Sequence, residues 1–216
     1  MARFLKGILG GFEGLVGTVV GSTWRTIDVM KSRSKKSKKA PVQEQIDQRF
    51  IFGMVIKFLT FMKDVIDLGY QSNSSGMTPM NAALSYNVQN AVTGISPVFE
   101  LNYPEVVLSV GSLHRAKSVT AIPEPADQIK IDWLSDNGKQ LSNTYEPEKD
   151  DAMVIIFNTK DEMYSFDTVK RSVGTLTMTL PRSWQGDPLH GWLFFTSPDH
   201  KKVSKSQYIG AMVTIP

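Results

Sequence analysis

The residues that most often carry chemistry are few in this chain and do not form a catalytic pattern. His114, His190 and His200 are the only histidines, and none has a partner at metal-ligand or nucleophile–base spacing. No Gly-x-Ser-x-Gly motif surrounds any serine. His190 lies in an apolar stretch beside Trp192, where we expect a half-buried structural histidine. The sequence therefore predicts a protein that is not an enzyme, with no catalytic residue.

Acidic residues gather between Glu146 and Asp151, together with Glu148 and Asp150. Carboxylates are the ligands that calcium prefers, but their spacing here lacks the pattern of a calcium loop. We expect a solvated entry to a strand instead. The chain also has no cysteine, which excludes disulfides and thiolate metal sites. These features predict neither a metal site nor a cofactor.

Anion binding is the chemistry that the residue types allow most directly. The stretch KSRSKKSKK, residues 31–39, contains six basic residues and no acidic one. Such a run favours an extended, solvated linker. It also fits an arm that binds nucleic acid by releasing counterions from phosphates, although no aromatic residue is interleaved for stacking on bases. A membrane surface or an acidic protein surface is a further alternative. The candidate nucleic-acid-binding residues are Lys31, Arg33, Lys35, Lys36, Lys38 and Lys39.

Charge is distributed unevenly, although the net charge is only +3. Residues 1–69 hold 12 basic against 6 acidic residues, whereas residues 70–216 hold 12 against 15. The two halves should therefore attract each other, or attract each other's copies. Hydrophobic residues make up 41% of the 216 residues, which is enough for a sizeable core.

The front of the chain, residues 6–30, combines six glycines with short β-favouring pieces. We predict a hairpin with strands over 15–20 and 24–30 around Gly21-Ser22-Thr23. A phosphate-binding loop is an alternative interpretation, but no Gly-Lys-Ser/Thr follows Gly7, Gly10 or the later glycines. A hairpin alone cannot bury its apolar side chains. It therefore needs a partner surface, either the long helix of its own chain or a neighbouring subunit.

That long helix is predicted from Pro41 to Gly69. Apolar residues recur at helical spacing in two adjoining rows, which makes the apolar stripe wide enough to be covered from more than one side. A second helix is predicted through about Val92, with Thr78 as its N-cap, Pro79 at its first position and Thr93-Gly94 after its end. The candidate assembly residues of the front third are Phe12, Val16, Val20, Trp24, Ile27, Phe50, Met54 and Phe58.

From about Pro104 onward the apolar period becomes two. This pattern predicts strands at 106–110, 129–133, 152–158, 176–180, 189–197 and 208–215, with 152–158 buried on both faces. Turns are expected at 136–138, 186–188 and 197–199. The predicted fold is α+β, with an N-terminal β-hairpin arm and two helices followed by an antiparallel sandwich. The predicted domains are 1–40 for the arm and basic linker, 41–103 for the helical region and 104–216 for the sandwich.

Several motifs resemble known proteins. The sandwich pattern, with a buried tryptophan on its second strand, resembles a fibronectin type III or immunoglobulin-like module without the disulfide. Motifs along nearly the whole chain are similar to an uncharacterised family of proteins of about this length from Bacteroidetes, a resemblance that implies no assigned activity. The glycine-rich opening, the basic linker and a helix starting with Gln and Arg are also similar to the openings of some tailed-phage virion proteins. The family motifs are 7–12, 16–24, 28–30, 48–50, 83–87, 91–94 and 203–210.

Our leading hypothesis is a non-enzymatic structural protein that self-assembles through its N-terminal arm and helix, such as a virion (phage capsid or tail) component or another repetitive particle. The alternative is a nucleic-acid-binding or packaging protein that uses residues 31–39. A third is a carbohydrate- or surface-binding sandwich, which requires at least one of Trp184, Trp192 and Tyr208 to be exposed. We expect other copies of the chain as partners. No apolar run approaches the length of a membrane span, so we expect none. Glu13 and the glycines argue against a signal peptide, and we therefore expect a location in a virion or the cytoplasm.

Overall fold

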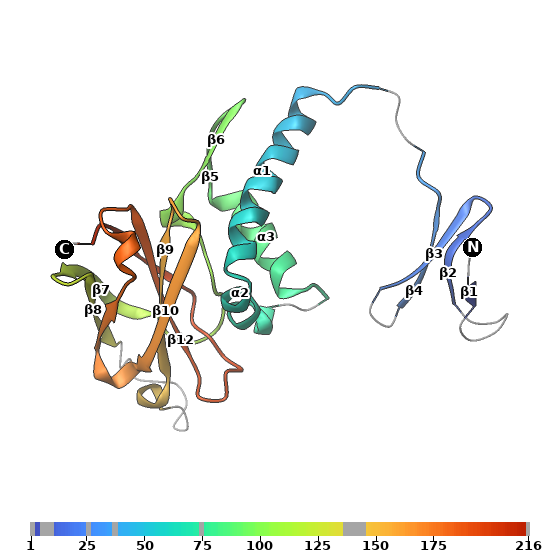
Figure 1. Cartoon of the computed structure of the whole chain (residues 1–216). Helices are drawn as coiled ribbons and strands as arrows, with labels where there is room; N and C mark the ends of the chain where they lie inside the picture. The colour runs from blue at the N-terminus through green and yellow to red at the C-terminus, as the bar shows by residue number, and fades with distance from the viewer. Residues whose placement is uncertain are drawn as a thin grey trace. The chain divides into compact units, whose positions relative to one another are not determined.

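The computed structural model describes residues 3–4, 11–24, 27–35, 39–73, 76–135 and 146–214. The chain divides into two compact units, Met1–Val42 and Gln43–Pro216, and Figure 1 labels most of their helices and strands. Each unit is described by itself. The expectations for Gly7, Gly10, Lys36, Lys38, the turn at 136–138 and the strand end at Ile215 lie outside the described residues.

The first unit is an antiparallel sheet in chain order, which we call the ribbon. Its strands are β1 (Arg3–Phe4), β2 (Phe12–Val16), β3 (Val19–Trp24) and β4 (Ile27–Ser32). The predicted hairpin is wrong in its turn, because Gly21 lies inside β3, paired with Gly14 and Met30. The turn falls instead at Gly17, whose φ of 58° suits glycine. At Gly21 a side chain would collide with the Phe12 ring, 2.7 Å from the ideal Cβ position.

The second unit begins with helices α1 (Gln43–Phe61), α2 (Lys63–Gly69) and α3 (Pro79–Asn90). The single long helix predicted for 41–69 is wrong at Met62, which leaves helical geometry with φ −101° and ψ 28°. There the Met62 amide donates to the Leu59 carbonyl at 3.1 Å, the tighter i→i−3 bond of a 3-10 turn. The cap of α3 is confirmed, since Thr78 accepts a hydrogen bond from the Asn81 amide at 3.2 Å. The helix ends at Asn90 rather than Val92.

The C-terminal strands form two antiparallel sheets. One sheet has the order β11-β8-β7, and the other has the order β10-β9-β12-β13. This three-plus-four arrangement confirms the predicted α+β class with a sandwich-like, β-rich part. Single 3-10 turns occupy Gln71–Asn73, Tyr103–Glu105, Pro147–Lys149, Arg171–Val173 and Arg182–Trp184. The strands are β7 (Ala116–Glu124), β8 (Gln128–Ser135), β9 (Asp151–Asn158), β10 (Met163–Lys170), β11 (Thr175–Thr179), β12 (Leu189–Thr196) and β13 (Gln207–Met212).

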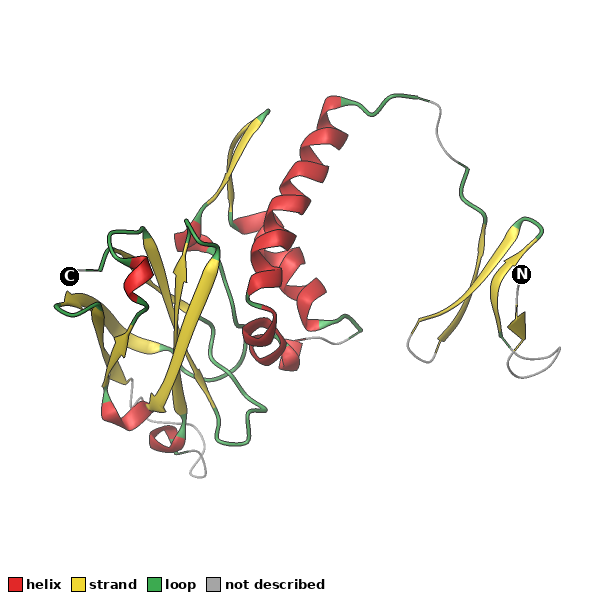
Figure 2. Ribbon diagram, viewed as in Figure 1, coloured by secondary structure: helices red, strands yellow, loops and turns green. Residues whose placement is uncertain are grey.

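The four-stranded sheet is the middle of three layers in this unit. Met153, Ile155 and Phe157 of β9 join the core beneath the helices, whereas the alternate residues of β9 join the core between the two sheets. Figure 2 shows the helices on one side of this sheet. The prediction that 152–158 is buried on both faces is therefore confirmed, as is the burial of Trp133.

Two segments after α3 differ from the sequence-based expectation. Thr93-Gly94, which we expected just after the end of the second helix, instead belongs to a hairpin of β5 (Val92–Ile95) and β6 (Val98–Leu101). This hairpin stands beside α1 in Figure 1. The strand predicted at 106–110 is a buried loop. The Asn87 side chain accepts a hydrogen bond from the Val107 amide and donates one to its carbonyl, both at 2.9 Å. Side chains thus satisfy this backbone in place of a neighbouring strand.

Candidate interaction surfaces

Among the residues of the first unit that the structure describes, none forms a second layer over the ribbon. Of its described residues, only Gly21 is buried. Trp24 is 48% exposed and Ile27 is 59% exposed. Soluble proteins seldom leave adjoining large apolar residues exposed unless the surface binds something. The ribbon is therefore a candidate interaction surface.

The strand register separates the predicted assembly residues of the ribbon onto two faces. Val20 and Trp24 point to one side of β3, and Ile27 is the cross-strand partner of Trp24. Leu15 pairs with Val20 and Val29 pairs with Ser22, so both lie on this side as well. Phe12 and Val16 belong to the opposite face. We call the first set, Leu15, Val20, Trp24, Ile27 and Val29, the ribbon face.

Helix α1 carries a second apolar surface. Ile46, Phe50, Met54 and Phe61 recur at spacings that place them along one side of the helix. Phe50 is 53% exposed, and its ring centroid lies 6.2 Å from that of Phe99 on β6. Ile46 and Phe61 are also exposed, and Met54 is half-buried. We call these four residues the helix strip.

A small cavity of about 220 Å³ continues the helix strip toward the sheet. Its wall is largely aromatic, and the exposed ion pair of Lys57 with Glu162, 2.5 Å between Nζ and Oε1, stands at its edge. An exposed pair of this kind contributes little to stability. The lining residues are Met54, Lys57, Phe58, Phe61, Leu101, Tyr103, Phe157, Thr159 and Glu162.

Phe58 differs from the other candidate assembly residues because it is buried in the core beneath the helices. Its ring centroid lies 5.1 Å from that of Phe157 and 5.9 Å from that of Tyr103, in both cases edge to face. Phe58 therefore forms the floor of the cavity and stabilises the unit, whereas Phe50 lies at the surface.

The basic run is exposed where the structure describes it. Lys31 is the next-to-last residue of β4, and Arg33 and Lys35 line an open hollow together with Thr18. The Arg33 amide donates to the Thr18 carbonyl at 2.7 Å, which holds the start of the run against the β2–β3 turn. Lys39 is exposed as well. The run thus places several cations on one side of the ribbon's end.

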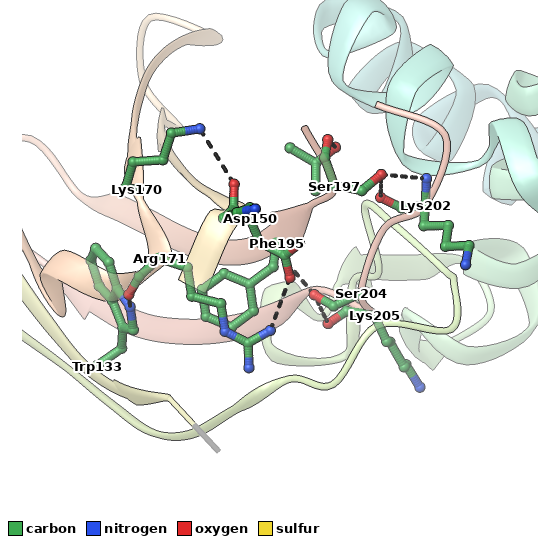
Figure 3. Close-up of polar contacts among 11 residues, drawn as sticks. Trp133, Asp150, Lys170, Arg171, Phe195, Ser197, Lys202, Ser204 and Lys205 are labelled. Atoms are coloured by element: carbon green, nitrogen blue, oxygen red, sulfur yellow. Dashed lines mark hydrogen bonds and ion pairs between the residues drawn. The ribbon is translucent and has the colours of Figure 1, made fainter. Parts of the chain in front are cut away.

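The acidic stretch contains a polar site that sequence reasoning missed. Asp150 is not solvated as expected; it is buried and pairs with Arg171, with 3.3 Å between Oδ2 and Nη1. Figure 3 shows the Arg171 guanidinium beside the Phe195 ring, 4.0 Å from its centroid. The Trp133 indole donates to the Arg171 carbonyl at 3.0 Å. The only sequence signal was an acidic residue directly before a strand whose middle, residues 152–157, is apolar.

His190 occupies the half-buried position that was predicted. Its ring stacks on Tyr103 at 4.0 Å between centroids, and its Nδ1 lies 2.6 Å from the Tyr208 hydroxyl. Burial lowers the pKa of the His190 imidazole. Trp184 and Trp192 are both buried, and Tyr208 is half-buried against His190. The carbohydrate hypothesis therefore lacks the exposed aromatic residue that it requires.

Other classes of site find no support in the part of the chain that the structure describes. In that part, no three His, Asp or Glu side chains gather as a metal site would need. The described helices include none that is long and apolar enough to cross a membrane.

The fold and these surfaces define an α+β protein in which helices cover one sheet of a sandwich and a separate ribbon carries an exposed apolar face. The chain belongs to a family of unknown function (DUF6266), whose profile matches residues 11–210. The match thus includes β2, β3, β4 and the basic run as well as most of the second unit. A comparison with curated proteins returns no match.

Proposed function

We propose that this protein is a non-enzymatic structural protein that self-assembles through the ribbon face. The observation that carries the proposal is a sheet whose apolar face leaves Trp24 and Ile27 about half exposed in the described part of its unit. The family profile covers residues 11–210, which include β2, β3 and β4 of the ribbon together with most of the second unit. We extend the proposal to a virion component, or another repetitive particle, of Bacteroidetes or their phages, located in the virion or the cytoplasm.

The energetics favour contacts of moderate strength between copies, and we call each such contact a joint. Complete burial of one Leu, Ile or similar side chain contributes about 1.5–3 kcal/mol. The ribbon face has five apolar side chains that are half-buried or exposed, so covering it contributes roughly 4–8 kcal/mol. Association costs at least ~4 kcal/mol in lost translational and rotational freedom. A single joint is therefore weak to moderate, and repeated joints would hold a particle together.

Sedimentation of the full chain tests the proposal. We expect the natural protein to form oligomers whose size grows with concentration. The double substitution Trp24→Ser and Ile27→Ser should raise the dissociation constant about 100-fold, because it removes roughly 2.7 kcal/mol of apolar contact per joint.

The matched control is Ile122→Ser with Leu134→Ser, which removes two equally exposed apolar side chains from the sandwich. This variant should assemble like the natural protein. A natural protein that stays monomeric at every concentration, or a ribbon variant that assembles unchanged, would contradict the proposal.

Nucleic-acid packaging is the second candidate function. The exposure of Lys31, Arg33 and Lys35 on one side of the ribbon's end favours it. In the sequence as a whole, Met1–Val42 holds nine basic residues against two acidic ones, a net of +7. Such a unit attracts polyanions without reading their sequence.

Fluorescence anisotropy with a labelled DNA or RNA oligonucleotide tests this candidate. Affinity should fall steeply with salt, and changing Lys35, Lys36, Lys38 and Lys39 to Gln should reduce the slope of log affinity against log salt by about 3–4. Changing Lys57, Lys117, Lys130 and Lys201 to Gln serves as the control with the same loss of charge. Salt-insensitive binding, or equal losses in both variants, would remove nucleic acid as a partner.

A further inference from the structure

We infer that the helix strip and the adjoining cavity are the docking site for the ribbon face of a second copy, an inference that rests on the proposed function of self-assembly. The ribbon face and the helix strip each bring together several exposed apolar residues across neighbouring strands or turns. Each surface exposes apolar side chains that the other surface could cover. The ribbon is the donor and the helix strip is the acceptor.

The two surfaces match in length. From Ile46 to Phe61 the helix strip extends about 22 Å, at ~1.5 Å for each residue of an α-helix. Strand β3, which carries Val20 and Trp24, has 6 residues and extends about 20 Å at ~3.3 Å for each residue. The ribbon face can therefore lie along the helix and cover the strip from end to end.

The cavity fits a side chain better than a small molecule. Its 220 Å³ lies below the ~300–1,000 Å³ that small-molecule sites usually have. Phe58, Tyr103 and Phe157 give it an aromatic wall. Trp24 is the ribbon's large exposed aromatic residue, and a tryptophan in an aromatic pocket is a common energetic centre of an interface. The geometry thus assigns the cavity to an anchor such as Trp24.

Charge excludes the simplest alternative, in which two ribbons pair with each other. With a net of +7 on each first unit, two ribbons would repel. Gln43–Pro216 holds the remaining 15 basic and 19 acidic residues, a net of −4, so it attracts the ribbon of another copy.

A donor that differs from its acceptor makes a head-to-tail joint. Each copy then offers one free ribbon and one free helix strip, so the joints either close a ring or propagate a filament. This geometry suits a protein that builds a repetitive particle.

A complementation experiment with full-length variants tests the inference. The donor variant carries Trp24→Ser and Ile27→Ser, and the acceptor variant carries Ile46→Ser and Phe50→Ser. Each alone should sediment as a monomer. Their mixture should form a 1:1 dimer and nothing larger, because only one intact donor and one intact acceptor remain in the pair. Thermal unfolding of each variant checks that both units are folded.

Phe52→Ser is the matched control on the same helix. Phe52 is 52% exposed but lies on another side of α1, about 200° around the helix from Phe50. This variant should assemble as the natural protein does. An acceptor variant that assembles normally while the donor variant does not would overturn the docking site and leave self-assembly standing. If the natural protein is monomeric, both the docking site and self-assembly are overturned.

Cysteine pairing tests the contact directly, since the chain has no cysteine of its own. A copy with Ile27→Cys and a copy with Phe61→Cys should form a disulfide-linked heterodimer on oxidation. A copy carrying both substitutions should form links between chains. Efficient links within one diluted chain would show that the ribbon covers its own helix, which would overturn docking between copies.

Discussion

Replacing Asp150 by alanine is expected to lower the free energy of unfolding by about 3–5 kcal/mol, because it removes the carboxylate that pairs with the buried Arg171 charge. Both side chains of the pair are only 1% exposed. Taking an ion out of water is costly, and the carboxylate offsets that cost only while it is present. Since the whole stability of a domain is about 5–15 kcal/mol, this loss is a large fraction of it.

Urea unfolding of the full chain measures this loss, and Asp151→Ala is the control. Asp151 is the next residue and pairs with Lys170 at 2.6 Å, but that pair is partly exposed to water. Its loss should cost at most about 1 kcal/mol. Changing Asp150 to Asn together with Arg171 to Met should recover much of the stability, because no unpaired charge is left buried. Equal losses in the two single variants would show that the buried Asp150–Arg171 pair contributes no more to stability than the partly exposed Asp151–Lys170 pair.

Replacing Phe58 by alanine is expected to cost about 3–5 kcal/mol, as large-to-small changes in packed cores do. The lost ring packs against Phe157, Tyr103 and Trp192. Phe50→Ala on the same helix face should cost less than about 1 kcal/mol, because half of that ring is already in water.

The Phe50→Ala and Phe58→Ala variants should also differ in their sedimentation and in their melting temperatures. Phe50→Ala should weaken assembly while the melting temperature stays nearly unchanged. Phe58→Ala should lower the melting temperature by roughly 6–20 °C, at about 2–4 °C for each kcal/mol in a chain of this size. If Phe58→Ala left the protein stable, the core beneath the helices would not be packed as described.

Some elements were predictable because a local pattern reports burial directly. The apolar run at 152–158 leaves no polar side for water, so a strand covered on both faces was the expected outcome, and β9 confirms it. Thr78 before Pro79 determines a helix start through its own hydroxyl, with no help from distant residues. Both features depend on neighbours in the sequence.

Other elements depended on distant residues and were mispredicted. Val106–Val110 reads as a strand by hydropathy, but Asn87 of α3 satisfies its backbone and keeps it a loop. The turn of the ribbon falls at Gly17, while the Phe12 ring lies over Gly21 and keeps it within β3. Asp150 looked solvated because Arg171, its partner, is 21 residues away.

The amino-acid sequence alone determined that the front of this protein is basic, glycine-rich and apolar, and that its later part is a sandwich of alternating strands, because composition and periodicity are properties of neighbouring residues. Only the tertiary structure decided which apolar side chains remain exposed. Phe50 and Phe58 are eight positions apart on one helix, yet the sheet covers one and leaves the other in water. Burial is set by what packs against a residue, and that is not written in its immediate sequence.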